Sequence, residues 1–438
     1  MTIKSVDHAP PVQHALIVHP VRSGSGQARN PQARLEEAIG LALALDLEIT
    51  ETVISPLRGR TPATLFGKGK VEELRLLCEV EGIDVVVVDD QLTPIQQRNL
   101  EKAWATKVID RTGLILEIFA RRARTREGKL QVELARLAYE RSRLVRTWTH
   151  LERQRGGFGK TGGPGETQIE LDRRGIADRI VKMKKELEEV RRTRTLHRSA
   201  RQKAPYPTIA LVGYTNAGKS TLFNHLTNAK VLAQDMLFAT LDPTLRTVKL
   251  PGGRPAILSD TVGFVSDLPH ELIEAFRATL EEVQEANVIL HVRDIAGIDS
   301  EAQKADVEAV LSEIGVGPGD DDRTLIEIWN KIDLVPEADL PDLEGAARRH
   351  GAMAVSAVTG QGCEALLNHL ALLVDETPEI HVTLDIGAGE ALAWLYRHGR
   401  ITDRHDSSDG RLRVRARLDT QALGRFERLF PSAQVEAM

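Results

Sequence analysis

The stretch PTIALVGYTNAGKSTLFNHL (207–226) decides the fold of the central part of this chain. The apolar run TIALV is followed by GYTNAGKS (213–220), which matches the pattern G-x-x-x-x-G-K-[ST], and TLFNHL continues with helical character. Between a strand and a helix, the two glycines let backbone N–H groups approach phosphate oxygens, and the helix N-terminus adds a positive field. The stretch therefore predicts a nucleotide-phosphate loop (P-loop) in an α/β domain with a mostly parallel sheet flanked by helices.

Two residues of this loop carry its chemistry. Lys219 is expected to reach the β- and γ-phosphates, and the hydroxyl of Ser220 is expected to bind Mg²⁺. A second Gly-Lys-Thr triplet lies in RGGFGKTGGPGETQ (155–168), but Gln154 stands where the template needs its first glycine, and the preceding segment has helical character. Phosphate binding is therefore assigned to the first motif.

The base of the nucleotide is predicted from WNKID (329–333), which follows the strand-like run TLIEI. The carboxylate of Asp333 can accept hydrogen bonds from N1–H and the exocyclic amino group of guanine. Adenine lacks both donors, and leaving the desolvated carboxylate unpaired costs about 1–3 kcal/mol. Lys331 is expected to lie along the base and Asn330 to brace the loops, while VSAVTG (355–360) supplies backbone groups for the guanine O6.

SDTVGF (259–264) is predicted to read the γ-phosphate from the end of the strand PAILSD. Asp260 is expected to hold Mg²⁺ through water, and the amide of Gly263 is expected to contact the γ-phosphate. The motif therefore completes a magnesium and phosphate site together with the P-loop.

LFATLDPT (237–244) lies between these two motifs and is predicted to form a switch segment. Thr240 is the candidate for the threonine that closes over Mg²⁺ when the γ-phosphate is present. Thr244 and Thr247 are alternatives, and ordinary loop threonines would give the same pattern.

The predicted site thus draws on several loops of one domain. The residues expected to contact the nucleotide are Gly213, Tyr214, Thr215, Asn216, Ala217, Gly218, Lys219, Ser220, Thr221, Phe238, Ala239, Thr240, Leu241, Asp242, Asp260, Thr261, Val262, Gly263, Asn330, Lys331, Ile332, Asp333, Ser356, Ala357 and Val358. Those expected to act in hydrolysis are Lys219, Thr240 and Gly263, and the expected metal ligands are Ser220, Thr240 and, through water, Asp260.

Residues 1–110 alternate short apolar runs with helical patterns, which predicts a small N-terminal α/β domain. Strands are expected at 14–20, 47–54 and 83–90, and helices at 30–45 and 70–82.

Residues 111–204 predict a basic helical hairpin with a glycine-rich tip. Leucines form one stripe over 130–151, and apolar residues over 176–190 alternate at spacings of four and three. The segment holds 25 Lys+Arg against 12 Asp+Glu, whereas the rest of the chain holds 33 against 51. A basic segment in an acidic chain predicts a polyanion-binding surface, with a solvated helical face as the alternative.

Two further domains follow the proline-marked linker RQKAPYPT (201–208). Strands and helices alternate over 205–375, and ETPEI (376–380) marks the next boundary. Residues 376–438 predict a small C-terminal α/β domain with the strands IHVTLD and RLRVRARLD and helices around ALAWLYRHG and ALGRFERLF.

Composition excludes several classes for the 438-residue chain. With 42% hydrophobic and 28% charged residues, and without an apolar run of eighteen, it is typical of a globular protein with no membrane span. Residues 1–14 lack the apolar core of a secretory signal, and two cysteines cannot form a disulfide framework. We therefore expect a cytoplasmic protein that requires no membrane. A monomer is the expected oligomeric state.

The order of basic hairpin, GPGETQIELDRR (163–174), GYTNAGKS, FATLDPT, DTVGF and NKID resembles the HflX family of ribosome-associated GTPases, over nearly the whole chain, including GKGKVEEL (67–74). The resemblance implies a P-loop GTPase domain, binding to the large ribosomal subunit, and a role in ribosome splitting, rescue or subunit maturation. In that family the hairpin tip approaches the peptidyl-transferase region. This implies contacts with ribosomal RNA by Arg155, Gly157, Lys160, Thr161 and Gly165.

Phe264 departs from the pattern of Ras-like enzymes, which place a glutamine there to orient the attacking water. Because an apolar ring cannot polarise water, we expect slow intrinsic hydrolysis that the ribosome stimulates; related systems reach about 10³–10⁵-fold. Arg246 is a candidate cation in cis, with surface solvation as the alternative. The position of Asn216 resembles that in GTPases that use bound K⁺, and loop capping is its alternative.

Two questions stay open at this level. GKGK (67–70) precedes a helix and suits an anion or a glycine-capped loop, so additional use of ATP is left undecided. The competing functions are an RNA-remodelling module that does not act on ribosomes and a GTPase that binds a membrane or a protein scaffold.

Overall fold

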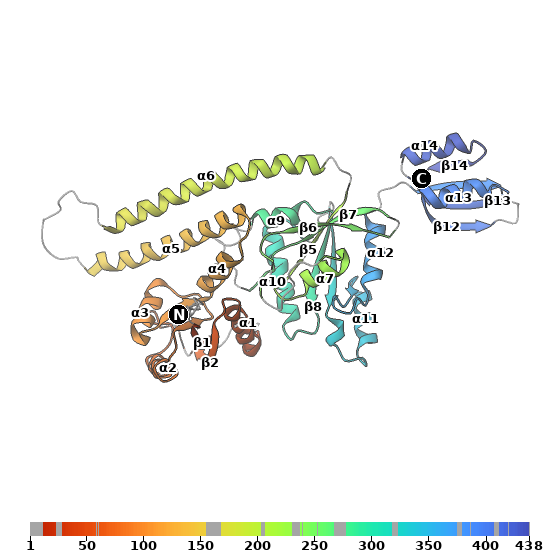
Figure 1. The fold of residues 1–438 in the computed structure, drawn as a ribbon. Coiled ribbons are helices and arrows are strands. Elements are labelled where there is room, and N and C mark those ends of the chain that lie inside the picture. The colour runs from red at the N-terminus through yellow and green to blue at the C-terminus, as the bar shows by residue number, and fades with distance from the viewer. Residues whose placement is uncertain are drawn as a thin grey trace, which may run out of the picture. The chain divides into compact units, whose positions relative to one another are not determined.

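The structure is a computed structural model of the 438-residue chain, and Figure 1 shows its fold. It describes residues 12–22, 29–57, 59, 61–154, 168–202, 206–229, 237–238, 240–251, 253–266, 277–317, 323–374, 379–385, 387–406, 411–418 and 420–437. The chain divides into two compact units, one of residues 1–248 and 256–363, the other of residues 249–255 and 364–438. The four-segment division made from the sequence is finer than this and stays a prediction.

The first unit begins with a four-stranded parallel sheet in the order β2-β1-β3-β4, which confirms the predicted N-terminal α/β fold. Its elements are β1 (His14–Arg22), α1 (Pro31–Leu43), β2 (Glu48–Leu57), α2 (Lys68–Glu81), β3 (Val85–Val88), α3 (Pro94–Trp104), β4 (Lys107–Asp110) and α4 (Arg111–Arg122). Local signals set the helix starts: Asn30 caps α1, and Thr93 with Gln96 forms a capping box at α3.

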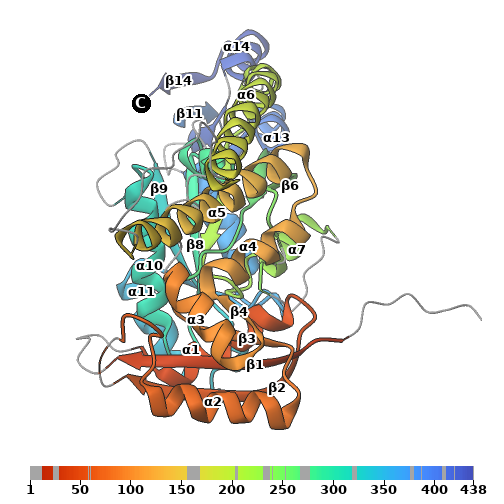
Figure 2. The ribbon, with the colours of Figure 1, turned by 90° about the vertical axis from the view of Figure 1, so that its left-hand side faces the viewer.

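The alternation of side chains along β1 divides the apolar core of this sheet between its two faces. Ala15 and Ile17 are buried with α1 and α4, whereas Leu16 and Val18 are buried with α2 and α3 (Figure 2). Helix α4 lies within the segment that the sequence assigned to the hairpin, yet its residues pack in the core of the N-terminal sheet. The same core continues into the next sheet of the unit.

The predicted hairpin consists of α5 (Arg126–Gln154) and α6 (Gln168–Gln202), which lie side by side and antiparallel (Figure 1). Arg179 of α6 pairs with Glu133 of α5 at 2.9 Å, and Ile180 and Leu187 are buried. Both helices are longer than the predicted stripes, because polar helix-forming residues extend them beyond their apolar contacts. The predicted tip lies outside the described residues.

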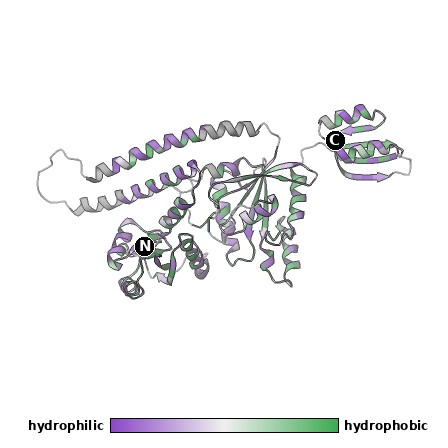
Figure 3. Ribbon diagram, in the orientation of Figure 1, coloured by the Kyte–Doolittle hydropathy of each residue, from purple (hydrophilic) through white to green (hydrophobic). Residues whose placement is uncertain are grey.

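The central sheet has the order β10-β9-β8-β5-β7-β6, and the described pairings of its first five strands are parallel. Its strands are largely hydrophobic (Figure 3). The elements of this part are β5 (Thr208–Gly213), α7 (Lys219–Thr227), β6 (Thr244–Lys249), β7 (Pro255–Asp260), α9 (Arg277–Gln284), β8 (Val288–Asp294), α10 (Ser300–Glu313), β9 (Thr324–Asn330), α11 (Leu340–Arg349) and β10 (Met353–Ala354). Parallel pairing brings the carboxyl ends of β5, β7 and β9 to one edge, where ligands of such sheets bind.

The second unit contains α12 (Cys363–Leu373, from Glu364 onward) and an antiparallel sheet in the order β12-β13-β11-β14. The elements of its terminal domain are β11 (Glu379–Asp385), α13 (Gly389–His398), β12 (Arg400–Asp406), β13 (Arg411–Arg417), α14 (Thr420–Leu429) and β14 (Gln434–Ala437). One face of the sheet buries Val382 and Val414 with Leu395 and Phe426 of the helices. The sequence predicted β11, β13 and both helices, but it missed the two edge strands.

Every helix in the ranges that the structure describes is too short or too polar to cross a bilayer.

Candidate functional site

The P-loop connects the end of β5 at Gly213 to the start of α7 at Lys219. Gly218 has a φ of +90°, and a Cβ placed on it would collide with the side-chain amide of Asn330. Glycine is therefore needed at this position for two reasons: the backbone is left-handed, and the side chain of Asn330 approaches closely. No side chain caps the N-terminus of α7, so its first N–H groups have no side-chain acceptor there.

Lys219, the first residue of α7, is 5% exposed. Its Nζ donates hydrogen bonds to the carbonyl oxygens of Gly213 at 3.1 Å and Tyr214 at 2.7 Å. Burial lowers the pKa of Lys219 to about 8, against the opposing effect of the Asp260 carboxylate. A buried ammonium beside the first turn of a helix is suited to binding phosphate oxygens.

Three predicted metal ligands converge in the structure. The hydroxyl of Ser220 lies 2.7 Å from Asp260 Oδ2 and 2.9 Å from Thr240 Oγ1, and Thr240 donates to Asp260 Oδ2 at 2.9 Å. The other oxygen of Asp260, Oδ1, is buried without a hydrogen-bond partner, and burial raises the pKa of this carboxyl. Three oxygen donors with an unsatisfied buried carboxylate oxygen fit Mg²⁺, which prefers oxygen ligands.

Of the three candidate threonines, only Thr240 contacts this set among the described contacts. Thr244 begins strand β6, and Thr247 is exposed on the same strand. Arg246, the candidate cation, is exposed as well.

The predicted base-binding residues hold three loops together. Asn330 donates through Nδ2 to the Ala217 carbonyl at 2.8 Å and accepts from the Ala357 N–H at 3.0 Å. Asp333 accepts a 2.6 Å hydrogen bond from the hydroxyl of Ser356, and Lys331 pairs with Asp294 at 2.7 Å. The Ala357 N–H, expected to face the guanine O6, is thus donated to Asn330 in this structure.

The remaining predicted nucleotide contacts differ in where their side chains lie. Buried are Tyr214, Thr215, Ala217, Phe238, Leu241, Thr261, Val262, Gly263 and Ile332. Asn216 has a φ of +58°, Val358 is 74% exposed, and the carboxylate of Asp242 bonds to residues before helix α5. The Thr215 hydroxyl is buried without a partner. Ala239 and the predicted RNA contacts Arg155, Gly157, Lys160, Thr161 and Gly165 lie outside the described residues.

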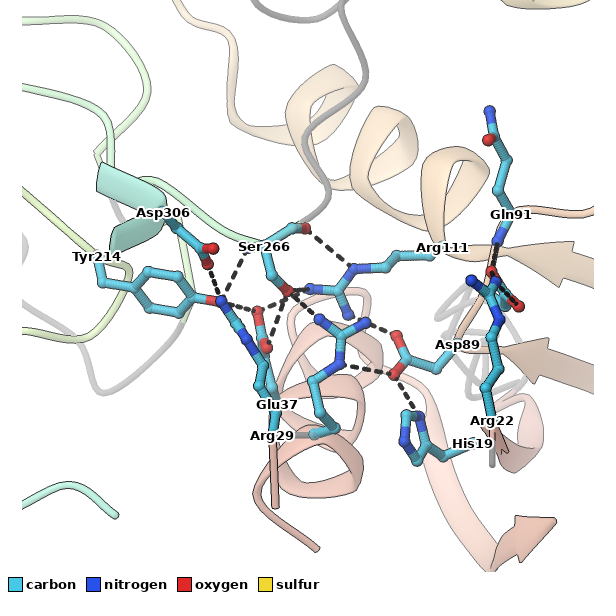
Figure 4. Close-up of polar contacts among 12 residues, drawn as sticks. His19, Arg22, Arg29, Glu37, Asp89, Gln91, Arg111, Tyr214, Ser266 and Asp306 are labelled. Atoms are coloured by element: carbon cyan, nitrogen blue, oxygen red, sulfur yellow. Dashed lines mark hydrogen bonds and ion pairs between the residues drawn. The ribbon is translucent and has the colours of Figure 1, made fainter. Parts of the chain in front are cut away.

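The contact of Tyr214 that links the P-loop to the N-terminal sheet was not predicted from the sequence. Its hydroxyl accepts from the Ser266 N–H at 2.8 Å and bonds to Glu37 of α1 at 2.9 Å, beside Arg29 (Figure 4). Burial and the nearby Glu37 raise the pKa of Tyr214, so the phenol stays protonated. A tyrosine in a phosphate loop carries no sequence signal for such a contact.

Arg111 joins the same network from the start of α4 (Figure 4). Its guanidinium pairs with Asp89 at 2.5 Å and with Glu37 at 2.8 Å, and it donates to the Ser266 hydroxyl at 2.8 Å. Asp89 also contacts His19 at 2.8 Å. Ser266 follows the DTVGF motif by two residues, so this buried cluster connects the predicted γ-phosphate sensor to the N-terminal sheet.

Comparison with protein families finds matches along most of the chain. Residues 32–120 match a GTP-binding GTPase N-terminal family, and residues 122–201 match a GTP-binding GTPase middle region. Residues 208–331 match the family described as 50S ribosome-binding GTPase, and residues 343–437 match the HflX C-terminal domain.

Individual relatives extend over the same length. A GTPase HflX of Magnetococcus marinus is 53% identical over 379 residues, which cover 86% of each chain. The GTPase HflX of Escherichia coli is 42% identical over 385 residues, which cover 88% of this chain and 89% of the relative. Among solved structures, a GTP-binding protein of Sulfolobus solfataricus in complex with GDP is 24% identical with a TM-score of 0.44, covering 83% of this chain and 99% of that one.

Proposed function

Since the chain belongs to the HflX family of GTPases, we propose that it is a Mg²⁺-dependent switch that binds the large ribosomal subunit through its basic hairpin and acts in ribosome splitting, rescue or subunit maturation. Like the other members of this family, the chain binds GTP and hydrolyses it to GDP and phosphate. The observation that carries the switch proposal is the convergence of Ser220, Thr240 and Asp260 beside Lys219.

In the proposed mechanism, Lys219 binds the β- and γ-phosphates, and the N–H groups at the start of α7 complete the phosphate site. Ser220 and Thr240 would hold Mg²⁺ directly and Asp260 would hold it through water. When bound, the metal neutralises charge that develops on the phosphate oxygens. Asp333 selects guanine, and its bond to Ser356 orients the carboxylate for that contact.

The switch itself would be the segment around Thr240 together with Gly263. Thr240 can close on the metal site when a γ-phosphate is present, and hydrolysis removes the partner that holds it there. A difference in affinity between the GTP-bound and GDP-bound forms for the ribosome follows from that change.

Slow intrinsic hydrolysis is the second part of the proposal. Phe264 is 3% exposed and packs in the apolar core, while its backbone bonds to Gly213 and Thr215. Its ring therefore offers no group that orients a water molecule. The ribosome would supply the missing stimulation, and a cytoplasmic monomer is the form in which we propose that the protein meets it.

Charge supports the hairpin as the ribosome-binding element. Lys182, Lys184 and Lys185 are exposed on α6. Ribosomal RNA presents a dense array of phosphates, and cationic side chains bind it with a strong dependence on salt.

Sedimentation with purified ribosomal subunits tests the proposal. The chain bound to a non-hydrolysable GTP analogue should pellet with the large subunit more than the GDP form does, and with the large subunit more than with the small one. Replacing Lys182, Lys184 and Lys185 by glutamine should weaken binding and reduce its salt dependence by about one phosphate contact per lysine. Lys102→Gln with Lys107→Gln is the control, because both lysines are exposed and lie in α3 and β4, outside the hairpin. Equal binding to any structured RNA would instead indicate a general RNA-remodelling module.

We also propose that Asn216 supports a K⁺ ion beside the phosphates. The residue has a left-handed backbone within the P-loop, at the position where K⁺-dependent GTPases carry an asparagine. A fixed cation there would stabilise charge that develops during hydrolysis.

A further inference from the structure

The switch segment lies against the N-terminal part of its own unit. Phe238 meets Phe119 of α4 edge to face, with ring centroids 4.6 Å apart and an interplanar angle of 78°. Leu237 packs so closely on α1 that a Cβ on Gly40 would lie 3.1 Å from its Cδ1. Leu241 is 5% exposed. The described residues on both sides of Thr240 are therefore fixed by packing against helices outside the nucleotide site.

Asp242 anchors this segment to the start of hairpin helix α5. Its Oδ2 accepts hydrogen bonds from the backbone N–H groups of Arg124 at 2.9 Å and Thr125 at 3.0 Å, and its Oδ1 accepts one from the Thr125 hydroxyl. Thr125 in turn accepts from the N–H of Gly128 at 3.0 Å, in the manner of an N-cap. A carboxylate at this end of the helix is also favoured by the helix dipole.

Gly128 makes the close approach of Asp242 feasible. A Cβ placed on this residue would lie only 2.5 Å from Asp242 Oδ1, much closer than a methyl carbon approaches an oxygen atom to which it is not bonded. Glycine is otherwise a poor residue for a helix, since alanine is favoured there. Its presence in the first turn of α5 is accounted for by the carboxylate that occupies the space of the missing methyl group.

Asp242 is also close to the metal site along the chain. Thr240, two residues earlier, bonds to Ser220 and Asp260. We propose that Asp242, held by Thr125 and Gly128, is a positioning residue for Thr240, so that the first turn of the hairpin helix helps the site distinguish GTP from GDP. This inference rests on the proposed function, because Thr240 must be the residue that closes over Mg²⁺.

The consequence is a reciprocal coupling between α5 and the nucleotide. An interaction that stabilises the first turn of α5 also stabilises the closed position of Thr240. Because coupling is reciprocal, closure of Thr240 stabilises that turn by the same free energy. Couplings of this type change affinity by about 5–150-fold.

The test compares nucleotide affinities of the full chain and its variants in the presence of Mg²⁺. For each protein, the dissociation constants of GDP and of a non-hydrolysable GTP analogue are measured by calorimetry. Gly128→Ala should weaken binding of the GTP analogue by about tenfold, within the usual range of coupling, and leave the affinity for GDP unchanged. Its melting temperature should change little, because the helix propensity gained with alanine opposes the loss of the hydrogen bonds of Asp242. Gly69→Ala, in the first turn of α2 with nothing within 4 Å of the new Cβ, is the matched control.

Two further variants separate positioning from general damage. Asp242→Asn and Thr125→Val should reproduce the loss of preference for the GTP analogue, and Thr125→Ser, which keeps the hydroxyl, should restore it. The inference is overturned if Gly128→Ala and Asp242→Asn keep the wild-type ratio of affinities while Thr240→Ala lowers it. If Thr240→Ala also leaves the ratio unchanged, the switch assignment itself is wrong, and the proposed function fails with it.

Discussion

Arg111→Met probes the buried cluster that joins the N-terminal sheet to Ser266. The substitution keeps a long apolar side chain but removes the guanidinium, whose side chain is 3% exposed. Asp89, with a side-chain exposure of 1%, then loses its 2.5 Å partner, and Glu37 loses its 2.8 Å partner. Two carboxylates are left in a site from which water is largely excluded.

Removing one member of a buried ion pair typically costs about 3–5 kcal/mol of unfolding free energy. The lower end applies here, because His19 still bonds to Asp89 and Arg34 Nε lies 3.7 Å from it. The unit that contains Arg111 holds residues 1–248 and 256–363. At about 2.1 cal/mol/K of unfolding entropy per residue, each kcal/mol lowers its melting temperature by about 1.3 °C, so we expect a decrease of about 4 °C. Arg111→Lys should give an intermediate decrease, since an ammonium cannot reach all the partners of a guanidinium.

The pH dependence of this decrease adds a second signature. Burial acts to raise the pKa of Asp89, but Arg111, His19 and Arg34 hold it below its ordinary value. The stabilisation of the wild type by the Asp89–Arg111 ion pair is thus complete above about pH 3.9, the pKa of aspartate in the unfolded chain. It is lost as the pH falls through the lower pKa that Asp89 has in the folded protein. The difference between wild type and Arg111→Met should therefore be largest near neutral pH and shrink as the pH falls below about 4.

Calorimetric melting of the full chain, with hydrogen exchange at the amides near Ser266, provides the assay. Arg75→Met is the control and should change neither readout, because Arg75 is a partly exposed residue of α2 that pairs with Glu72 and Glu79 at the surface. The reasoning is refuted if Arg111→Met melts like wild type, or if exchange near Ser266 is unaltered.

Three other changes have defined outcomes. Tyr214→Phe removes the acceptor of the Ser266 N–H, so the unfolding free energy measured by calorimetry should decrease by about 1–3 kcal/mol. An unchanged melting curve would contradict a stabilising role for the hydrogen bond between Tyr214 and Ser266. His291 is 2% exposed, and burial lowers its pKa to about 4, so stability should fall as the pH drops from about 6.5 toward 4. His291→Leu should flatten that part of the stability curve, and an identical slope would show that another group titrates. GTP turnover should be faster in KCl than in NaCl at equal ionic strength, and Asn216→Ala should abolish the difference; equal rates in wild type would exclude a K⁺ site.

Much of the fold was predictable because its signals are local. The β-branched run at 85–88, the Asn30 cap and the glycine after α2 each fix an element within a few residues. The edge strand β12 was missed because its sequence, RITDRHD, carries charged residues in place of the alternation that marks a half-buried strand. The edge strand β14 was missed because its four residues, QVEA, are too few to establish a pattern.

The motifs of the nucleotide site were readable for a related reason: each is a short segment with a fixed spacing at the end of a strand. Contacts between distant segments had no such signal. Asp242 was expected at the nucleotide, yet its carboxylate bonds to residues 124 and 125, more than a hundred positions earlier. Tyr214 and Arg111 likewise find their partners only when the two sheets pack together.

Guanine selection by Asp333 tests the central claim most directly. Calorimetry should compare GDP, ADP and xanthosine diphosphate on wild type and on Asp333→Asn. Of these three nucleotides, the wild type should bind only GDP with high affinity. The variant should lose GDP affinity by about 5–150-fold, equivalent to about 1–3 kcal/mol, and should gain affinity for xanthosine diphosphate, because the asparagine amide can donate to the oxygen at C2 of xanthine. An unaltered preference for GDP in the variant would contradict the account of this site.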